Sequence, residues 1–203
     1  MRAKRFFVSL ELPAPIVETL VRLNPHLPGV RWSAPEQIHL TLAFLGNVAL
    51  DEEEKLRARL LAIQFTSFFL PLSGLGTFPA RGRPKIIWIG VGRGHPHLFQ
   101  LHKRVTDAAL GAGIEPDLRP WHPHFTLARC QDVAAQSIRA FLRASERFDV
   151  GLVRIDSFQL KSSRLTPAGS EYTTELSVPA SGSARASSGS CRSSGDSPQR
   201  TLS

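Results

Sequence analysis

The sequence predicts an α+β domain in which antiparallel strands and amphipathic helices are mixed along the chain. Segments with period-two apolar spacing alternate with helical ones, but without the regular strand–helix–strand rhythm of a parallel sheet. A helix followed by a strand with the pattern His-x-Thr-x occurs twice, which suggests an internal duplication. The composition, with 42% hydrophobic and 21% charged residues in 203, is that of a globular protein with a sizeable core.

Short apolar runs bounded by Pro, Gly or Asn predict the strands, and apolar residues at three- and four-residue spacing predict the helices. Acids in the first turn and arginines further along one helix also match the helix dipole. Two of the strands are expected to pair around the Pro- and Gly-rich turn 79–84. The expected strands are 6–10, 38–45, the pair 68–75 and 85–91, 121–129, 148–160 and 172–178, with a short extended piece at 30–32; the expected helices are 15–23, 51–63, 96–110 and 133–142.

Charge and hydropathy narrow the class of protein. No apolar run approaches the ~20 residues of a membrane helix. The basic N-terminus is not followed by a signal peptide, because Glu11 and Pro13 interrupt the apolar stretch too early. We therefore expect a cytoplasmic protein without membrane association, with Cys130 and Cys191 as free thiols. The formal net charge of +8 favours a polyanionic partner.

The composition changes near residue 180. The segment 181–203 is rich in Ser, Gly and Arg and has Leu202 as its single large aliphatic residue. Such a segment cannot bury enough apolar surface to offset the entropy of ordering it. We expect one folded domain over residues 1–178 and a disordered tail over 179–203. The tail has three arginines and one aspartate, a net +2, which leaves +6 for the body.

Two short motifs carry the chemistry. They read His39-Leu-Thr41-Leu and His124-Phe-Thr126-Leu. Residues two apart in a strand share a face, so each strand presents an imidazole and a hydroxyl side by side, with its apolar residues turned into the core. A single His-x-Thr is weak evidence, whereas two copies with the same apolar alternation are much less expected by chance. If the two strands face each other, two histidines and two hydroxyls line one groove.

Such a groove suits the cleavage of a phosphodiester. One neutral imidazole can take a proton from water, while a protonated one donates to the leaving alkoxide. The hydroxyls of Thr41 and Thr126 can hydrogen-bond the phosphate oxygens. No carboxylate cluster accompanies either motif, so the chemistry does not demand a metal, and we expect no cofactor. The pairs His95/His97 and His122/His124 could suggest a metal site, but zinc usually needs three or four protein ligands.

The sequence resembles the 2H phosphoesterases, specifically the RNA 2′,3′-cyclic phosphodiesterases, also called 2′-5′ RNA ligases. The resemblance covers about the first 178 residues. It rests on Arg5 to Pro13, Val30 to Trp32, Ile38 to Gly46, Trp121 to Arg129 and Ser163 to Tyr172. It implies a two-lobed LigT-like fold, with antiparallel sheets flanking a central cleft, helices outside, and one motif on each side of the cleft.

The resemblance also implies hydrolysis of RNA or nucleoside 2′,3′-cyclic phosphates to 2′-phosphomonoesters without a metal. By position, His39 matches the proton donor to the leaving 3′-oxygen, and His124 matches the base that activates water. Thr41 and Thr126 match the phosphate-binding threonines. Two further candidates are Arg129, a cation near the phosphate, and Phe7, a ring for stacking on the terminal base.

Several alternatives stay open. The same site could join RNA ends through a 2′-5′ linkage, or serve another phosphoesterase of the superfamily. A non-catalytic RNA-binding protein with the same basic cleft is a third reading, although binding alone does not need a matched histidine pair. The partner expected in each case is RNA or a nucleotide, and we expect a monomer. Trp32 and Trp121 are expected to pack in the core, and the exposed cations Arg81, Arg83 and Lys85 could form a basic rim.

Overall fold

The computed structural model describes residues 4–92, 95–117, 119–167 and 169–181. Their backbone forms nine strands, four α-helices and one short 3₁₀ helix. In chain order the elements are β1 (Lys4–Glu11), α1 (Ala14–Arg22), β2 (Val30–Trp32), η1 (Pro35–Gln37), β3 (His39–Val48), α2 (Leu50–Leu61), β4 (Phe68–Phe78), β5 (Ile86–Gly90), α3 (Pro96–Gly111), β6 (His124–Cys130), α4 (Ala135–Ala144), β7 (Asp149–Ile155), β8 (Ser157–Thr166) and β9 (Gly169–Pro179).

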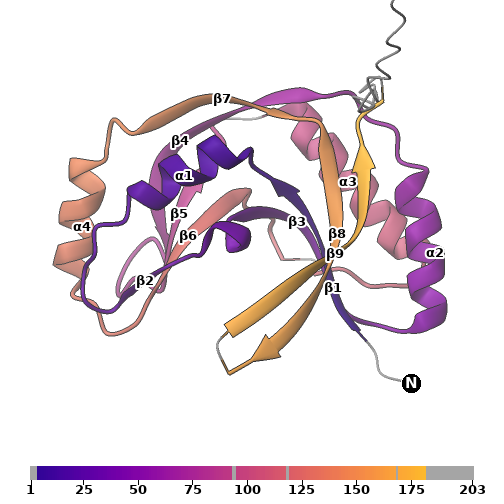
Figure 1. Cartoon of the computed structure of the whole chain (residues 1–203), viewed down its shortest axis with the longest axis horizontal. Coiled ribbons are helices and arrows are strands. Elements are labelled where there is room, and N and C mark those ends of the chain that lie inside the picture. The colour runs from indigo at the N-terminus through magenta and orange to yellow at the C-terminus, as the bar shows by residue number, and fades with distance from the viewer. Residues whose placement is uncertain (1–3, 93–94, 118, 168, 182–203) are drawn as a thin grey trace, which may run out of the picture.

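All the strands belong to one antiparallel sheet in the order β7-β4-β5-β6-β3-β1-β8-β9, with β2 paired to β6. The sheet has two halves, which meet where β3 pairs with β6 at Leu40 and Phe125. Helices α2 and α3 lie side by side at one end of the molecule, and α4 lies at the other (Figure 1). The α+β class and the two-lobed architecture expected from the sequence are confirmed.

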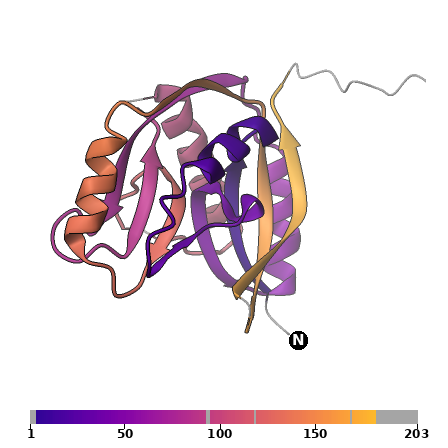
Figure 2. The ribbon, with the colours of Figure 1, turned by 60° about the vertical axis from the view of Figure 1, so that its left-hand side comes forward.

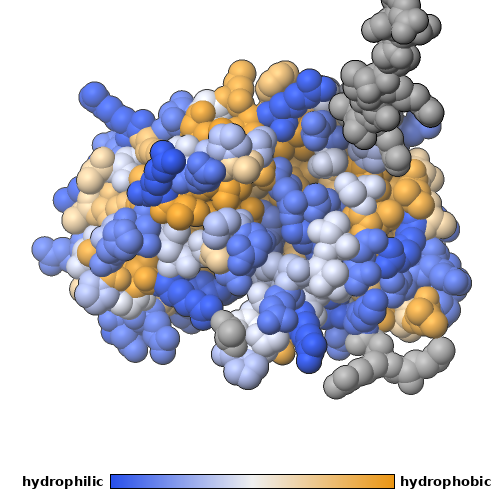
Figure 3. Space-filling model, viewed as in Figure 1, coloured by the Kyte–Doolittle hydropathy of each residue, from blue (hydrophilic) through white to orange (hydrophobic). Residues whose placement is uncertain are grey.

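The core follows this division. A large cluster lies between the sheet and helices α2 and α3, with Leu56 and Leu60 of α2 and Leu101 and Val105 of α3 almost fully buried. A smaller cluster joins Ile138 of α4 to β5 and β6. Helix α1 crosses in front of the sheet, as the turned view in Figure 2 also shows. In Figure 3, apolar surface gathers along the upper part of the same view, over α1 and the strands around it.

The expected single strand over 148–160 is wrong. The chain forms two strands instead, because β7 ends at Ile155 and β8 begins at Ser157. The buried positions change parity at this break, from Val153 and Ile155 to Phe158 and Leu160. A change of parity turns the apolar side chains to the other face, so the strand must bend or change partners. Here it changes partners: β7 pairs with β4 in one half, and β8 pairs with β1 in the other.

The C-terminal boundary also lies later than expected. The composition places residues 179–181 in the tail, but Pro179 ends β9 and Ala180 is 3% exposed. The amides of Ala180 and Ser181 donate to the carbonyls of Asp156 and Phe65. The rest of the expected tail, residues 182–203 with Cys191, lies outside the described residues.

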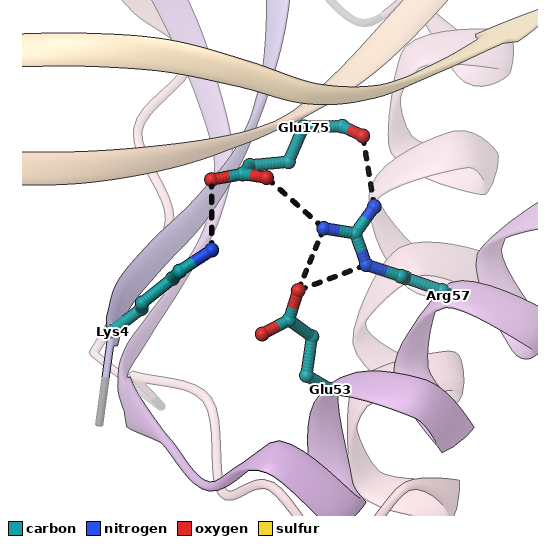
Figure 4. Close-up of polar contacts among 4 residues, drawn as sticks. All are labelled: Lys4, Glu53, Arg57 and Glu175. Carbon is teal, nitrogen blue, oxygen red and sulfur yellow. Dashed lines mark hydrogen bonds and ion pairs between the residues drawn. The ribbon is translucent and has the colours of Figure 1, made fainter. Parts of the chain in front are cut away.

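A partly buried ion-pair network ties the second half of the chain to the first (Figure 4). Arg57 of α2 donates to the Glu53 carboxylate at 2.6 Å and 2.9 Å, and to the Glu175 carboxylate of β9 at 3.1 Å. It also donates to the Glu175 carbonyl at 2.8 Å. Lys4 of β1 completes the network at 3.4 Å from the same carboxylate. The network therefore fixes α2 against the edge strand β9 and the beginning of β1.

Candidate active site

The two motifs lie side by side in the middle of the sheet. Leu40 of β3 is directly opposite Phe125 of β6, and both side chains are fully buried on one face. The histidines and threonines therefore share the other face. Because the strands are antiparallel, this register sets His39 beside Thr126 and Thr41 beside His124. The expected face of two imidazoles and two hydroxyls is present, and all four side chains are partly buried.

A β-bulge brings Arg129 to the same face. Trp88 of β5 pairs with Thr126, but the next residue, Ile87, pairs with Ala128, so one residue of β6 is extra. Without the bulge, Arg129 would lie on the face opposite to Thr126, since the two are three residues apart. With it, Arg129 pairs with Ile86 and its exposed side chain follows the polar face. Arg31 of β2 lies directly opposite Arg129 and shares that face.

Two aromatic rings surround the His39 imidazole. Phe7 of β1 stacks on it, with the ring centroids 5.0 Å apart. Tyr172 of β9 meets it edge-on at 5.3 Å and also contacts Phe7 at 5.0 Å. Phe7 is 4% exposed, so its ring offers no open face to a base. The expectation that Phe7 stacks on the terminal base of the substrate is therefore corrected: its ring packs against the His39 imidazole instead.

A hydrogen bond orients the His124 imidazole. Its Nδ1 lies 2.7 Å from the carbonyl oxygen of His122, which can only accept. In the neutral ring, Nδ1 therefore carries the proton and Nε2 keeps a free lone pair. Phe78 of β4 meets the ring edge-on at 5.0 Å, and Trp88 lies 6.3 Å away, so the ring has aromatic neighbours as His39 has.

Burial lowers the pKa of both histidines. The pKa of His39 falls from 6.5 to about 4, because burial disfavours the charged ring; a polar contact with the Gln37 backbone opposes the shift and the charge of His124 adds to it. Its Nδ1 has no hydrogen bond of normal geometry to any described residue. Burial also lowers the pKa of His124, against the hydrogen bond to the His122 carbonyl. Both rings are therefore neutral near pH 7 when no anion is bound.

Trp121 connects the two halves of the site. Its Nε1 donates to the carbonyl oxygen of Thr41 at 3.0 Å, and its ring stacks on His102 at 3.9 Å. Trp32 donates to the Leu20 carbonyl at 3.1 Å. Both tryptophans pack against the main core, as expected. The hydrogen bond of Trp121 holds the segment before β6 against β3. The same segment supplies the His122 carbonyl that orients His124.

Other expected features lie away from the histidine pair. Among the described residues, no three His, Cys, Asp or Glu side chains gather closely enough to hold a metal ion. Arg83 in the turn between β4 and β5 pairs with Asp132 at 3.2 Å, and both side chains are exposed. Cys130 is a free thiol. None of the helices within the described part of the chain is long and apolar enough to cross a membrane.

Three neighbours of the histidines cannot be predicted from the local sequence: Tyr172, Phe78 and Trp88. They come from β9, β4 and β5, which no local pattern connects to the motifs. His122 was visible as the partner of His124 in a His-x-His pair, but its carbonyl was not expected to orient that ring. The one available signal was that Tyr172 closes a stretch which the family resemblance includes.

Comparison with known proteins agrees with this geometry. The family model of the LigT like phosphoesterases matches the chain twice, over residues 10–88 and 89–172. The chain belongs to the LigT-like phosphoesterase family. Each match contains one His-x-Thr-x strand, in agreement with the internal duplication that the repeated pattern of this LigT-like phosphoesterase suggests.

Relatives of known name point the same way. The RNA 2′,3′-cyclic phosphodiesterase of Aeropyrum pernix is 37% identical over 153 residues, which cover 74% of this chain and 86% of the relative. The enzyme of the same name from Archaeoglobus fulgidus is 30% identical over 174 residues, which cover 83% of this chain and 96% of the relative. Among solved structures, Escherichia coli LigT in the apo form matches with a TM-score of 0.73 at 27% identity, covering 89% of this LigT-like phosphoesterase and 99% of that chain. The same Escherichia coli protein complexed with 3′-AMP matches with a TM-score of 0.72 at 27% identity, covering 88% of this chain and 99% of that chain.

Proposed function

We propose that this protein hydrolyses RNA or nucleoside 2′,3′-cyclic phosphates to 2′-phosphomonoesters. The observation that carries the proposal is the pairing of two His-x-Thr-x strands through Leu40 and Phe125. It gathers two imidazoles and two hydroxyls on one face of the sheet. The family and the names of the relatives support the cyclic phosphate as substrate.

In this mechanism the two histidines move two protons. His124 Nε2 removes a proton from a water molecule, whose oxygen attacks phosphorus. The bond from phosphorus to the 3′-oxygen breaks, and protonated His39 gives its proton to that oxygen. The phosphate stays on the 2′-oxygen, and the two histidines exchange protons with solvent before the next turnover.

The surroundings of each ring support this division of roles. The bond from His124 Nδ1 to the His122 carbonyl leaves Nε2 unprotonated in the neutral ring, as a general base requires. His39 must be protonated to act as the acid, although burial lowers its pKa to about 4. The negative charge of a bound cyclic phosphate favours the imidazolium and raises this pKa on binding.

Three further side chains serve the phosphate in the proposal. The hydroxyls of Thr41 and Thr126 donate to its non-bridging oxygens, and the Arg129 guanidinium offsets the charge that develops during attack. The formal charge of +6 on residues 1–178 would attract RNA to this face.

The deciding experiment is incubation with an RNA that ends in a 2′,3′-cyclic phosphate, followed by analysis of the product. We expect a 2′-phosphate terminus, because His39 protonates the 3′-oxygen. A 3′-phosphate product would reverse the regiochemistry, and an unchanged substrate would refute the proposed activity.

Two properties complete the proposal: a monomeric state and a cytoplasmic location. The histidine pair comes from one chain, which supports a site that is complete without a partner copy. Light scattering during size-exclusion chromatography tests the first, and cell fractionation tests the second.

A further inference from the structure

An ion pair outside the two motifs lies beside His39. Lys161 of β8 donates from its ammonium to the carboxylate of Glu11 at the end of β1. The Lys161 side chain is 7% exposed, and that of Glu11 is 38% exposed. A buried ammonium is costly without a partner, so Glu11 provides the charge that Lys161 needs. The proposed mechanism assigns no step to either residue.

The strand register places this pair around the His39 imidazole. Glu11 is directly opposite His39 in the pairing of β1 with β3. Lys161 is directly opposite Phe7 in the pairing of β1 with β8, and the Phe7 ring stacks on His39. Residues that are directly opposite each other share a face of the sheet. The carboxylate, the ammonium and the His39 ring are therefore on one face.

The ion pair draws the Glu11 carboxylate away from His39. Strand β1 lies between β3, which carries His39, and β8, which carries Lys161. Lys161 is opposite Phe7, four residues before Glu11, so the two side chains lean toward each other along β1 to make contact. The carboxylate is thus turned toward β8, although the residue directly opposite it on β3 is His39.

The surroundings of His39 agree with this direction. Burial lowers the pKa of His39 to about 4, the Gln37 backbone opposes the shift, and the charge of His124 adds to it. A carboxylate in contact with the ring would favour the imidazolium instead. The described elements around His39 bring further titratable side chains to its face. They are Glu11 of β1, His124 and Arg129 of β6, Arg31 of β2, Lys161 of β8 and Tyr172 of β9. Glu11 is the single carboxylate of this set.

Without Lys161, the Glu11 carboxylate would be within reach of His39. Directly opposite residues of an antiparallel pair have their Cβ atoms about 4.5–5.5 Å apart. Glu11 also lines a pocket of about 590 Å³ between α1, η1 and the end of β1, which gives its side chain room to turn. His39 Nδ1 has no hydrogen bond of normal geometry to a described residue, so the imidazolium would have a donor to offer the carboxylate.

We propose that Lys161 is a positioning residue: it holds the Glu11 carboxylate away from His39, so that the His39 imidazolium pairs with the substrate and not with the protein. The inference rests on the proposed function, in which His39 protonates the leaving 3′-oxygen. An imidazolium paired with Glu11 would be a weaker acid, and its ring would be turned away from that oxygen. Lys161 thus acts on the reaction through Glu11, without contact with the phosphate.

The test compares Lys161→Met with the double variant Lys161→Met/Glu11→Gln. An NMR titration of the ring protons in the free protein gives the pKa of His39, and kcat is measured with a 2′,3′-cyclic nucleotide. In Lys161→Met the pKa of His39 should rise by about one pH unit or more, because the released carboxylate turns to the imidazole. The kcat should fall about tenfold, because the acid is misdirected. In the double variant no carboxylate is left to turn, so both quantities should return to near their wild-type values.

Lys161→Gln is a second variant that removes the charge with little change in size. It should raise the pKa of His39 in the same direction, so the test does not depend on the folding of one variant. Circular dichroism should show that the variants are folded.

Gln159→Met is the matched control, because Gln159 lies two residues before Lys161 on the same face of β8 and has no charge. Its His39 pKa and its kcat should match those of the wild type. An unchanged or lowered His39 pKa in the Lys161 variants overturns the inference. A loss of kcat that the added Glu11→Gln does not restore also overturns it, because it would show a merely structural role. Absence of hydrolysis in the wild type would refute the proposed function itself, and the NMR titration would still decide whether Lys161 holds the carboxylate away from His39.

Discussion

Leu40 of β3 lies directly opposite Phe125 of β6, and neither side chain is exposed to solvent. This pair joins the two halves of the sheet and fixes the register of the two motif strands. A slip of one residue would turn one motif's histidine and threonine into the core. The pair that anchors the fold at its centre therefore also determines the geometry of the proposed catalytic histidines.

Replacing either histidine should remove nearly all activity. We expect His39→Ala and His124→Ala each to lower kcat/KM for a 2′,3′-cyclic nucleotide by about 10²–10⁴-fold, the usual contribution of a general acid or base. His97→Ala is the control, because His97 is an exposed residue of α3 outside the site. Circular dichroism should show all three variants folded. Turnover close to wild type in either of the first two variants would refute the two-histidine mechanism.

The pH dependence should reflect the lowered pKa values. One histidine must be neutral and the other protonated, so kcat/KM should give a bell-shaped profile that reports the free enzyme. Burial lowers the pKa of His39 to about 4 and also lowers that of His124, so the maximum should lie below pH 6.5. The rate should fall at higher pH as the acid loses its proton. The bound phosphate raises both pKa values, so the optimum of kcat should lie at higher pH. A single sigmoid in kcat/KM, or a maximum above about pH 7.5, would count against the paired imidazoles.

The pairing of each histidine with its threonine, and the positions of the helices, could be predicted from the sequence, because they depend on residue spacing within one element. Period-two alternation placed His39 with Thr41 and His124 with Thr126, and the structure confirms that each pair shares a face. The four helices also begin and end within a few residues of the expected bounds. These features depend on spacing within one element, which a sequence shows directly.

The parts that could not be predicted depend on which strands are neighbours. Arg129 reaches the polar face through a bulge opposite β5, and a bulge is a property of two paired strands. Tyr172 contacts His39 because β9 and β1 both pair with β8, far from the motif in sequence. The burial of Phe7 likewise follows from its neighbours Tyr172 and His39. The break between β7 and β8 does leave a signal in the sequence, because the apolar positions change parity after Ile155.

Phe7 and Tyr172 should act as positioning residues for His39. Phe7→Leu removes the ring stacked on the imidazole, and we expect kcat to fall roughly tenfold with KM little changed, because a less fixed ring is misplaced for proton transfer. The pH profile should also change: looser packing admits water and lets the His39 pKa rise toward 6.5. Phe69→Leu is the control, since Phe69 is 54% exposed on β4. A raised KM with an unchanged pH profile would instead indicate that Phe7 contacts the substrate.

Removal of divalent metal ions should leave hydrolysis unchanged. The proposed mechanism assigns both proton transfers to histidines and charge stabilisation to Thr41, Thr126 and Arg129. We therefore expect activity after extensive dialysis against EDTA to stay within about twofold of the untreated enzyme. Loss of activity that Zn²⁺, Mg²⁺ or Mn²⁺ restores would show that a metal takes part in the reaction.

The ion-pair network between α2 and β9 should matter for stability rather than for chemistry. Arg57→Ala leaves the Glu53 carboxylate, 11% exposed, and the Glu175 carboxylate, 18% exposed, without their shared partner. Glu175 keeps its pair with Lys4, but the Glu53 charge stays largely buried and loses the Arg57 partner. Breaking a buried pair from one side costs about 3 kcal/mol. Lys55→Ala is the control on the same helix: its pair with Asp51 is exposed on both sides, so its loss should cost less than about 0.5 kcal/mol. Urea unfolding of the three proteins measures the difference, and equal midpoints for Arg57→Ala and Lys55→Ala would contradict the prediction. The kcat of the folded Arg57→Ala protein should equal that of the wild type, because Arg57 contacts neither motif.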